Sequence, residues 1–333
     1  MDFNLDETQR ELKQLAADVL SMERSKEGSK EGDEERLWQA GLLSVCVPEA
    51  AGGAGLGPVE MAVVLREVGA RAAPVPALPV LAGQLLMARH AAPDRQPPPG
   101  ARLTLALREP GVPLAEPPRT TAREVSGRWE VSGRKTGVLH PDGAGVLVTA
   151  DEGLFLLESQ AGTPEHTSTG EPAATIVLDA TPAERVAGPE GARDAVQVFM
   201  AAVAAQASGV LAGALELTTG YIKQRRQFGR ALAEFQAVTM QIADVYIAGR
   251  ALDVAMWSAA WRLAEGLPAE QDLALAAYQV GEAVEALYTC QHLHGGLGLD
   301  VTYPLHRYFA QAKHLSHLLG GADAQLDLIG ALV

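Results

Sequence analysis

The sequence is poor in cysteine and in positive charge, and each shortage disfavours a class of protein. Its 333 residues include two cysteines, Cys46 and Cys290, both in apolar segments. This usage favours buried thiols over a disulfide framework or a metal site. Lys and Arg number 27 against 41 Asp and Glu, for a formal net charge of −14. That balance argues against a nucleic-acid-binding protein, although a local basic cluster can still bind phosphate.

The sequence also lacks the segments that direct a chain to a membrane. Apolar residues make up 47% of it. No run of about 18 uncharged apolar residues stands out, so no membrane span is expected. The acidic residues 1–7 lack the basic and apolar regions of a signal peptide. A cytoplasmic protein is therefore expected.

Changes in hydrophobic periodicity divide the first half of the chain. Residues 1–97 show helical spacing, with an exposed charged loop expected at 25–33. A Pro-rich segment at 90–100 marks the clearest boundary. Beyond it, apolar residues recur with a period of two in several short runs. Residues 98–188 are therefore expected to form a small β domain, of the barrel type.

The remaining residues, 189–333, carry helical patterns to the end of the chain. Four long helices are expected, at about 193–226, 234–265, 269–293 and 304–331. A helix of ~33 residues spans roughly 50 Å, and helices of that length need antiparallel neighbours. The pattern predicts a four-helix bundle, and hence an α+β protein that is mostly α.

A basic segment joins the first two of these helices. Lys223, Arg225 and Arg226 stand in the last turn of the first helix, and Gly229 follows them. Cations are favoured at a helix C-terminus, and glycine is typical of the turn beyond it. Two interpretations are open: a helix end with solvated charges, or an arginine cluster that binds a phosphate.

The residues around this junction form a motif that resembles the C-terminal signature of the acyl-CoA dehydrogenase family. The motif consists of Arg225, Gln227, Phe228, Gly229, Leu232, Phe235 and Gln236. A second similarity, Trp129-x-Val131-Ser132-Gly133-x-Lys135, matches a strand-turn-strand motif of the family's middle domain. The resemblance implies an N-terminal helical domain, a middle β-barrel and a C-terminal four-helix bundle.

The resemblance also implies contacts with FAD. By analogy with the family, Arg225 binds the FAD pyrophosphate, while Gln227, Phe228 and Leu232 pack against and hydrogen-bond the cofactor. The segment from His292 to Gly298 is similar to the family's Gln-x-x-Gly-Gly-x-Gly loop, with His292 in the glutamine position, followed by Gly295 and Gly296. The FAD contacted in this way belongs mainly to the neighbouring subunit. The other interpretation of the histidines is as polar caps at a helix end, and no carboxylate or cysteine cluster joins them to make a metal site.

The positions at which the family carries its catalytic glutamate are apolar in this sequence. One of the two known positions corresponds to Leu319, and the other to Phe199. An arginine that assists substrate binding is replaced by Met200. Asp323 lies one turn beyond Leu319, and its shorter side chain makes it a poor substitute. We therefore expect no catalytic residue in this chain.

The flavin-ring segments depart from the family pattern as well. The Thr-Glu-Pro segment reads Arg108-Glu109-Pro110, and the aromatic-Ile-Thr-Asn stretch ends at His140-Pro141. The chain is therefore not expected to cradle an isoalloxazine ring of its own.

These matches and departures together resemble a non-catalytic subunit of a heteromeric acyl-CoA dehydrogenase. The expected assembly is an α2β2 heterotetramer that desaturates an acyl-CoA, with FAD shared between subunits and the substrate bound mainly by the catalytic partner. Paired subunits of this kind resemble bacterial members that act on CoA thioesters of steroid side chains. Two alternatives remain: a self-sufficient homomeric dehydrogenase with a displaced base such as Asp323, and a flavin-free interaction protein.

Overall fold

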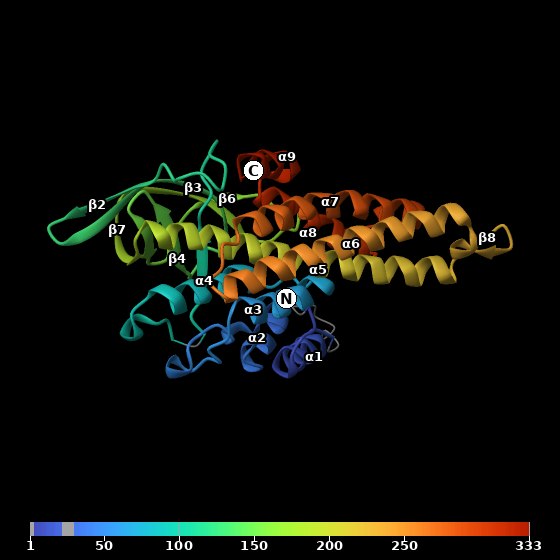
Figure 1. Cartoon of the computed structure of the whole chain (residues 1–333), viewed down its shortest axis with the longest axis horizontal. Coiled ribbons are helices and arrows are strands. Elements are labelled where there is room, and N and C mark those ends of the chain that lie inside the picture. The colour runs from blue at the N-terminus through green and yellow to red at the C-terminus, as the bar shows by residue number, and fades with distance from the viewer. Residues whose placement is uncertain (1–2, 22–29, 99, 333) are drawn as a thin grey trace.

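The computed structural model describes residues 3–21, 30–98 and 100–332. The chain is organised around α5 (Pro189–Gln224), a helix of 36 residues that runs along the long axis of the molecule (Figure 1). This helix packs against α3, α4, α6, α7 and α8. By length and composition α5 could cross a membrane, but 89% of its most apolar window is buried inside the protein. Gln197, Gln206 and Ser208 interrupt the apolar sequence of α5, which forms part of the core.

The N-terminal layer consists of four helices on one side of α5: α1 (Glu7–Ser21), α2 (Lys30–Gln39), α3 (Pro58–Ala70) and α4 (Ala77–His90). The loop expected at 25–33 does not extend to residue 33, because residues from Lys30 onward belong to α2. Residues 25–29 of that loop lie outside the described residues.

Glycines allow α3 and α5 to cross at very short range. A Cβ atom added to Gly69 would lie 2.0 Å from the carbonyl oxygen of Gln206. One added to Gly209 would lie 1.9 Å from the carbonyl oxygen of Arg66. Both separations are far below van der Waals contact, so this crossing accepts only residues without a Cβ. It fixes the N-terminal layer against the central helix.

The middle region is a seven-stranded sheet with the order β1-β4-β5-β7-β3-β2, and β6 pairs with β7. The β1 and β4 strands are parallel, and the other pairs are antiparallel. The end strands β1 and β2 do not pair with each other. Where a barrel was expected, the strands therefore form a sheet that backbone hydrogen bonds do not close. The strands are β1 (Leu103–Ala106), β2 (Thr121–Val125), β3 (Arg128–Leu139), β4 (Gly145–Ala150), β5 (Gly153–Leu157), β6 (Thr163–Glu165) and β7 (Ala173–Ala187).

The C-terminal bundle consists of α5 with α6 (Gln236–Ala264), α7 (Glu270–His294), α8 (Leu305–Leu318) and α9 (Gly321–Leu332). The single helix expected at 304–331 is two helices. The chain breaks at Gly320 and Gly321, whose φ angles are 88° and 83°. Two consecutive left-handed residues cannot continue a right-handed helix, and glycine adopts them without steric cost.

Candidate functional site

The basic junction after α5 is a β-hairpin. β8 (Arg226–Gln227) pairs with β9 (Arg230–Ala231), and Phe228 and Gly229 form the two-residue turn. Their φ angles are 53° and 79°, the positive pair that a type I′ turn requires. The sequence predicted a glycine-closed turn at this place, and its form is a hairpin that projects at one end of the molecule (Figure 1).

Phe228 lies at the tip of this hairpin, and both its exposure to solvent and its backbone conformation are unfavourable. Its side chain is 92% exposed, and its backbone is left-handed, which is rare for an aromatic residue. Phe228 meets Phe235 edge-on, with ring centroids 6.3 Å apart. Such strain and exposure together are typical of a residue that contacts another molecule.

The arginines of the hairpin differ in their surroundings. The Arg230 guanidinium stacks over the Phe235 ring at 4.0 Å from the centroid. Arg225 is exposed, and no described residue pairs with its guanidinium. Its backbone carbonyl accepts a hydrogen bond from the Leu232 N–H at 2.8 Å, which fixes the base of the hairpin. A free guanidinium on a rigid support suits an anionic ligand.

The glycine-rich loop begins where α7 ends, at His294. The His294 Nδ1–H donates to the Cys290 carbonyl at 2.8 Å, and Nε2 lies 3.2 Å from the Tyr303 hydroxyl. Burial lowers the pKa of His294, although the hydrogen bond with Cys290 acts in the opposite direction. His294 is therefore a neutral structural residue, which matches the interpretation as a polar cap.

The loop and the hairpin lie at the same end of the bundle. The His294 ring stacks on Tyr221 in the last turn of α5, with centroids 4.3 Å apart. The Tyr221 hydroxyl also donates to the His294 carbonyl at 3.4 Å. Beyond His294, Gly295 and Gly296 are exposed, as is His292 before it. Tyr221 and His294 were not among the predicted site residues, although an aromatic residue four positions before Arg225 was visible in the sequence.

The two positions for a catalytic glutamate are buried and apolar in the structure. Leu319 is 2% exposed at the break between α8 and α9, and its carbonyl accepts a 2.6 Å hydrogen bond from Gln325. Phe199 and Met200 are buried on α5. Asp323 is exposed in the first turn of α9, where the helix dipole stabilises a carboxylate. None of these positions offers a buried base.

Polar side chains of the protein itself fill the region of the expected flavin-ring segments. A Cβ atom on Gly137 would lie 2.7 Å from Nη1 of Arg108, so the guanidinium covers Gly137 directly. Glu165 accepts a 3.0 Å hydrogen bond from the Gly137 N–H. Burial lowers the pKa of Arg108, and the charge of Glu165 opposes that shift.

The neighbouring residues complete a charged cluster. His140 Nε2 lies 3.9 Å from Glu171 Oε1. Burial acts to raise the pKa of Glu171, but the effects of His140, Thr169 and His314 outweigh it and lower the pKa. The Arg108 guanidinium occupies the space directly over Gly137, so a ring cannot lie against that backbone as the side chains are placed. The residues present therefore do not fit an isoalloxazine.

Glu109, in the same segment as Arg108, forms hydrogen bonds within the β region. Its Oε1 accepts hydrogen bonds from Lys135 Nζ at 2.7 Å and from the Thr120 hydroxyl at 2.6 Å. Lys135 is fully buried, and burial lowers its pKa to about 8 against the effect of Glu109. Removing either partner would leave a buried charge uncompensated. Glu109 therefore has a structural role, as the partner of the buried Lys135.

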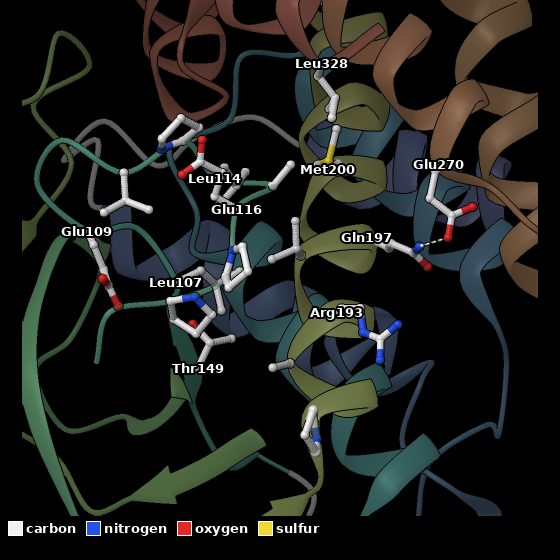
Figure 2. Close-up of a pocket in the computed structure, with 18 of the residues that line it drawn as sticks. Leu107, Glu109, Leu114, Glu116, Thr149, Arg193, Gln197, Met200, Glu270 and Leu328 are labelled. Carbon is white, nitrogen blue, oxygen red and sulfur yellow. Dashed lines mark hydrogen bonds between the residues drawn. The ribbon is translucent and has the colours of Figure 1, made fainter. Parts of the chain in front are cut away.

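A cavity of about 480 Å³ lies between the sheet, α5 and α9. Figure 2 shows the loop with Leu107 and Leu114 on one side of it and α5, with Met200, on the other. Leu328 of α9 closes it from the C-terminal side. The sequence did not predict this cavity, because its walls come from five segments far apart in the chain: the loop after β1, the end of β4, the start of α5, the start of α7 and α9.

Two family models match most of the chain. The acyl-CoA dehydrogenase N-terminal domain matches residues 6–95, and the acyl-CoA dehydrogenase C-terminal domain matches residues 188–333. Acyl-CoA dehydrogenase FadE28 of Mycobacterium tuberculosis is 37% identical over 99% of this chain and 98% of that protein. Acyl-CoA dehydrogenase FadE27 of the same organism is 32% identical, with the same coverage.

Solved structures give the same result. One chain of a steroid acyl-CoA dehydrogenase, the Tcur3481-Tcur3483 G363A variant, has a TM-score of 0.90 at 38% identity and covers 98% of this chain and 97% of its own length. One chain of the ChsE4-ChsE5 complex from Mycobacterium tuberculosis has a TM-score of 0.91 at 31% identity, covering 99% and 98%. With both terminal domain models matched and relatives aligned over nearly its whole length, this chain belongs to the acyl-CoA dehydrogenase family.

Proposed function

We propose that this chain is the non-catalytic subunit of a heteromeric, FAD-dependent acyl-CoA dehydrogenase. The observation that carries the proposal is the guanidinium of Arg108, which covers Gly137 where a flavin-ring site would lie. Buried apolar side chains at Phe199 and Leu319 support it, because neither position can supply a base. A catalytic partner subunit would provide the base and the flavin-ring site.

The proposed assembly desaturates an acyl-CoA between its α and β carbons. The partner would supply a base for the α-proton, and the FAD it holds would supply the hydride acceptor. Two of the similar solved structures are described as a steroid acyl-CoA dehydrogenase and as a two-protein complex. These descriptions favour a CoA thioester of a steroid side chain as substrate and an α2β2 heterotetramer as the assembly.

The contribution of this chain would be to hold the adenosine-diphosphate part of the partner's FAD. The guanidinium of Arg225, which no residue in the described part of the chain pairs, fits a pyrophosphate, since charge-assisted hydrogen bonds to phosphate are strong and directional. The exposed ring of Phe228 offers an apolar surface. Gln227 and Leu232 complete the hairpin side, and His292, Gly295 and Gly296 the loop side, with backbone that is free to approach a ligand.

The test is co-expression of this chain with its catalytic partner, followed by a count of flavin in the purified complex. Intact-mass measurement gives the subunit ratio, and the absorbance of released FAD gives the flavin content. We expect one FAD for each pair of subunits and little flavin on this chain alone. One tightly bound FAD on every subunit would overturn the proposal. A complex without flavin would instead favour an interaction protein.

A further inference from the structure

A small pocket lies between α1, α3 and α6, and it shares no residue with the hairpin, the glycine-rich loop or the larger cavity. Leu5 and Lys13 line it from the α1 side, Arg66 from α3, and Arg250 and Trp257 from α6. Its volume of about 160 Å³ is below the roughly 300–1,000 Å³ usual for sites that take organic ligands. A pocket of this size suits an ion or the end group of a larger molecule.

The lining of this pocket is rich in positive charge, although the net charge of the chain is −14. Three of its described lining residues are cations: Lys13, Arg66 and Arg250. Two are carboxylates, Glu67 and Asp253. Both carboxylates are buried, whereas Lys13 and Arg250 are exposed. A solute that enters the pocket from solvent therefore meets the cations first.

The two carboxylates are already neutralised within the protein. Asp253 accepts hydrogen bonds from Nε and Nη2 of Arg66 at 3.1 and 3.2 Å, and from Nη1 of Arg250 at 3.2 Å. Glu67 accepts a 2.6 Å hydrogen bond from Nη1 of Arg71, which is not one of the lining residues. With Arg71 included, four cations surround two carboxylates, so the electrostatic potential in the pocket favours an anion.

The three lining cations keep N–H donors that no described residue uses. Lys13 forms no ion pair or hydrogen bond with the described part of the chain. Arg250 donates only through Nη1, and Arg66 only through Nε and Nη2, to the described residues. Guanidinium and ammonium groups with free N–H donors are the usual protein ligands of phosphate oxygens.

We propose that this pocket binds one phosphate-sized oxyanion, held by Lys13, Arg66 and Arg250. The ion is either free phosphate or a phosphoryl group at the end of a larger molecule. Because its ligands come from α1, α3 and α6, the bound ion holds the N-terminal layer against the bundle. The proposal does not depend on FAD, since the pocket lies apart from the hairpin and the glycine-rich loop.

The experiment is equilibrium dialysis of the full-length chain against radiolabelled inorganic phosphate at pH 8. We expect saturable binding with a Kd of about 0.1–1 mM. Raising chloride from about 0.05 to about 0.5 M should weaken it about fivefold or more, because the contacts join opposite charges. Competition by phenyl phosphate distinguishes the two sources. Weaker competition than by unlabelled phosphate identifies the free ion, and equal or stronger competition identifies a phosphoryl group on a larger molecule.

Four variants locate the site. Lys13→Gln and Arg250→Gln should each weaken phosphate binding about fivefold or more, and both positions are exposed, so the fold should tolerate the changes. Arg123→Gln removes the same charge from an exposed position of β2, and Arg225→Gln removes it from the hairpin. Neither should change this Kd by more than about twofold. Absence of saturable binding below about 10 mM, or a loss in Arg225→Gln with none in Lys13→Gln and Arg250→Gln, would overturn the proposal.

Discussion

The rings of Tyr221 and His294 stack at a centroid distance of 4.3 Å with their planes 20° apart. This contact joins the last turn of α5 to the last turn of α7. The two elements proposed to hold the partner's FAD, the hairpin and the glycine-rich loop, follow directly from those turns. Their relative position therefore depends on a neutral imidazole that accepts a hydrogen bond from the Tyr303 hydroxyl.

The first prediction concerns pH. Burial holds the pKa of His294 below its ordinary value of 6.5, so the unfolded chain binds a proton that the folded chain does not. The free energy of unfolding should therefore fall as pH drops through that window, and stop falling below the folded-state pKa. Denaturant unfolding between about pH 7.5 and about pH 5.5 measures this. His294→Gln should flatten the dependence, whereas the same change at exposed His292 should not.

The second prediction concerns Arg225. In the complex, Arg225→Ala should weaken FAD binding about 10- to 100-fold, because a charge-assisted contact is worth roughly 1.5–3 kcal/mol. Titration of the apo-complex with FAD measures the change, which excess FAD should mask. Arg128→Ala is the matched control, since Arg128 is also exposed but begins β3, and the β2–β3 hairpin lies at the end of the molecule opposite to β8 (Figure 1). Equal losses in both variants would count against a direct contact.

The third prediction concerns Asp323, the nearest carboxylate in sequence to Leu319, one of the two positions of the family's catalytic glutamate. Asp323 is exposed in the first turn of α9. Asp323→Ala should therefore leave kcat of the reconstituted complex nearly unchanged at saturating FAD. Loss of a true general base would lower kcat by about 100-fold or more. A fall of that size with flavin content preserved would show that this chain carries its own active site.

The fourth prediction separates stability from binding at Phe228. Asn-Gly is the preferred pair for a type I′ turn, so Phe228→Asn relieves backbone strain at a position where the ring is 92% exposed. The free energy of unfolding should stay the same or rise by up to about 1 kcal/mol. Affinity of the complex for FAD should fall at the same time. A stability loss with normal FAD affinity would mean that Phe228 serves the fold alone.

The fifth prediction concerns the crossing of α3 and α5. Gly209→Ala places a Cβ 1.9 Å from the Arg66 carbonyl oxygen and should destabilise the chain by about 1–3 kcal/mol. Gly220→Ala on the same helix meets nothing within 4 Å and should stabilise it by about 0.5–1 kcal/mol. Thermal unfolding of the two variants measures the difference. A neutral Gly209→Ala would mean that the helices separate easily.

Sequence patterns correctly predicted the helices and turns that neighbouring residues alone determine. The apolar spacing of α5 and α7 gave their ends to within a few residues, and Gly229 marked a turn. The break between α8 and α9 was missed, although Gly320 and Gly321 are its cause, because the apolar period continues through them. Periodicity records which face is buried, and a kink need not change that face.

The site was predicted only in part, for a different physical reason. The motif at Arg225 is contiguous, so sequence sufficed to locate it, and its role in binding FAD stays a prediction. The occupation of the flavin-ring region depends on Arg108, Gly137 and Glu171, which only the folded sheet brings together. The substitution at Arg108 was visible in the sequence, but the direction of its side chain was not.

The contact of Arg108 with Gly137 makes the proposed loss of the flavin-ring site hard to reverse by single substitutions. Restoring a glutamate at Leu319 alone would bury an unpaired carboxylate in an apolar setting, which costs stability. Removing Arg108 alone would take away a positive charge that interacts with the carboxylate of Glu165. Each single reversal is disfavoured until several others are in place. Under the proposed function, a lineage that has filled the pocket in this way would keep its dependence on a second subunit, and a designer who wants a self-sufficient enzyme would have to change both regions at once.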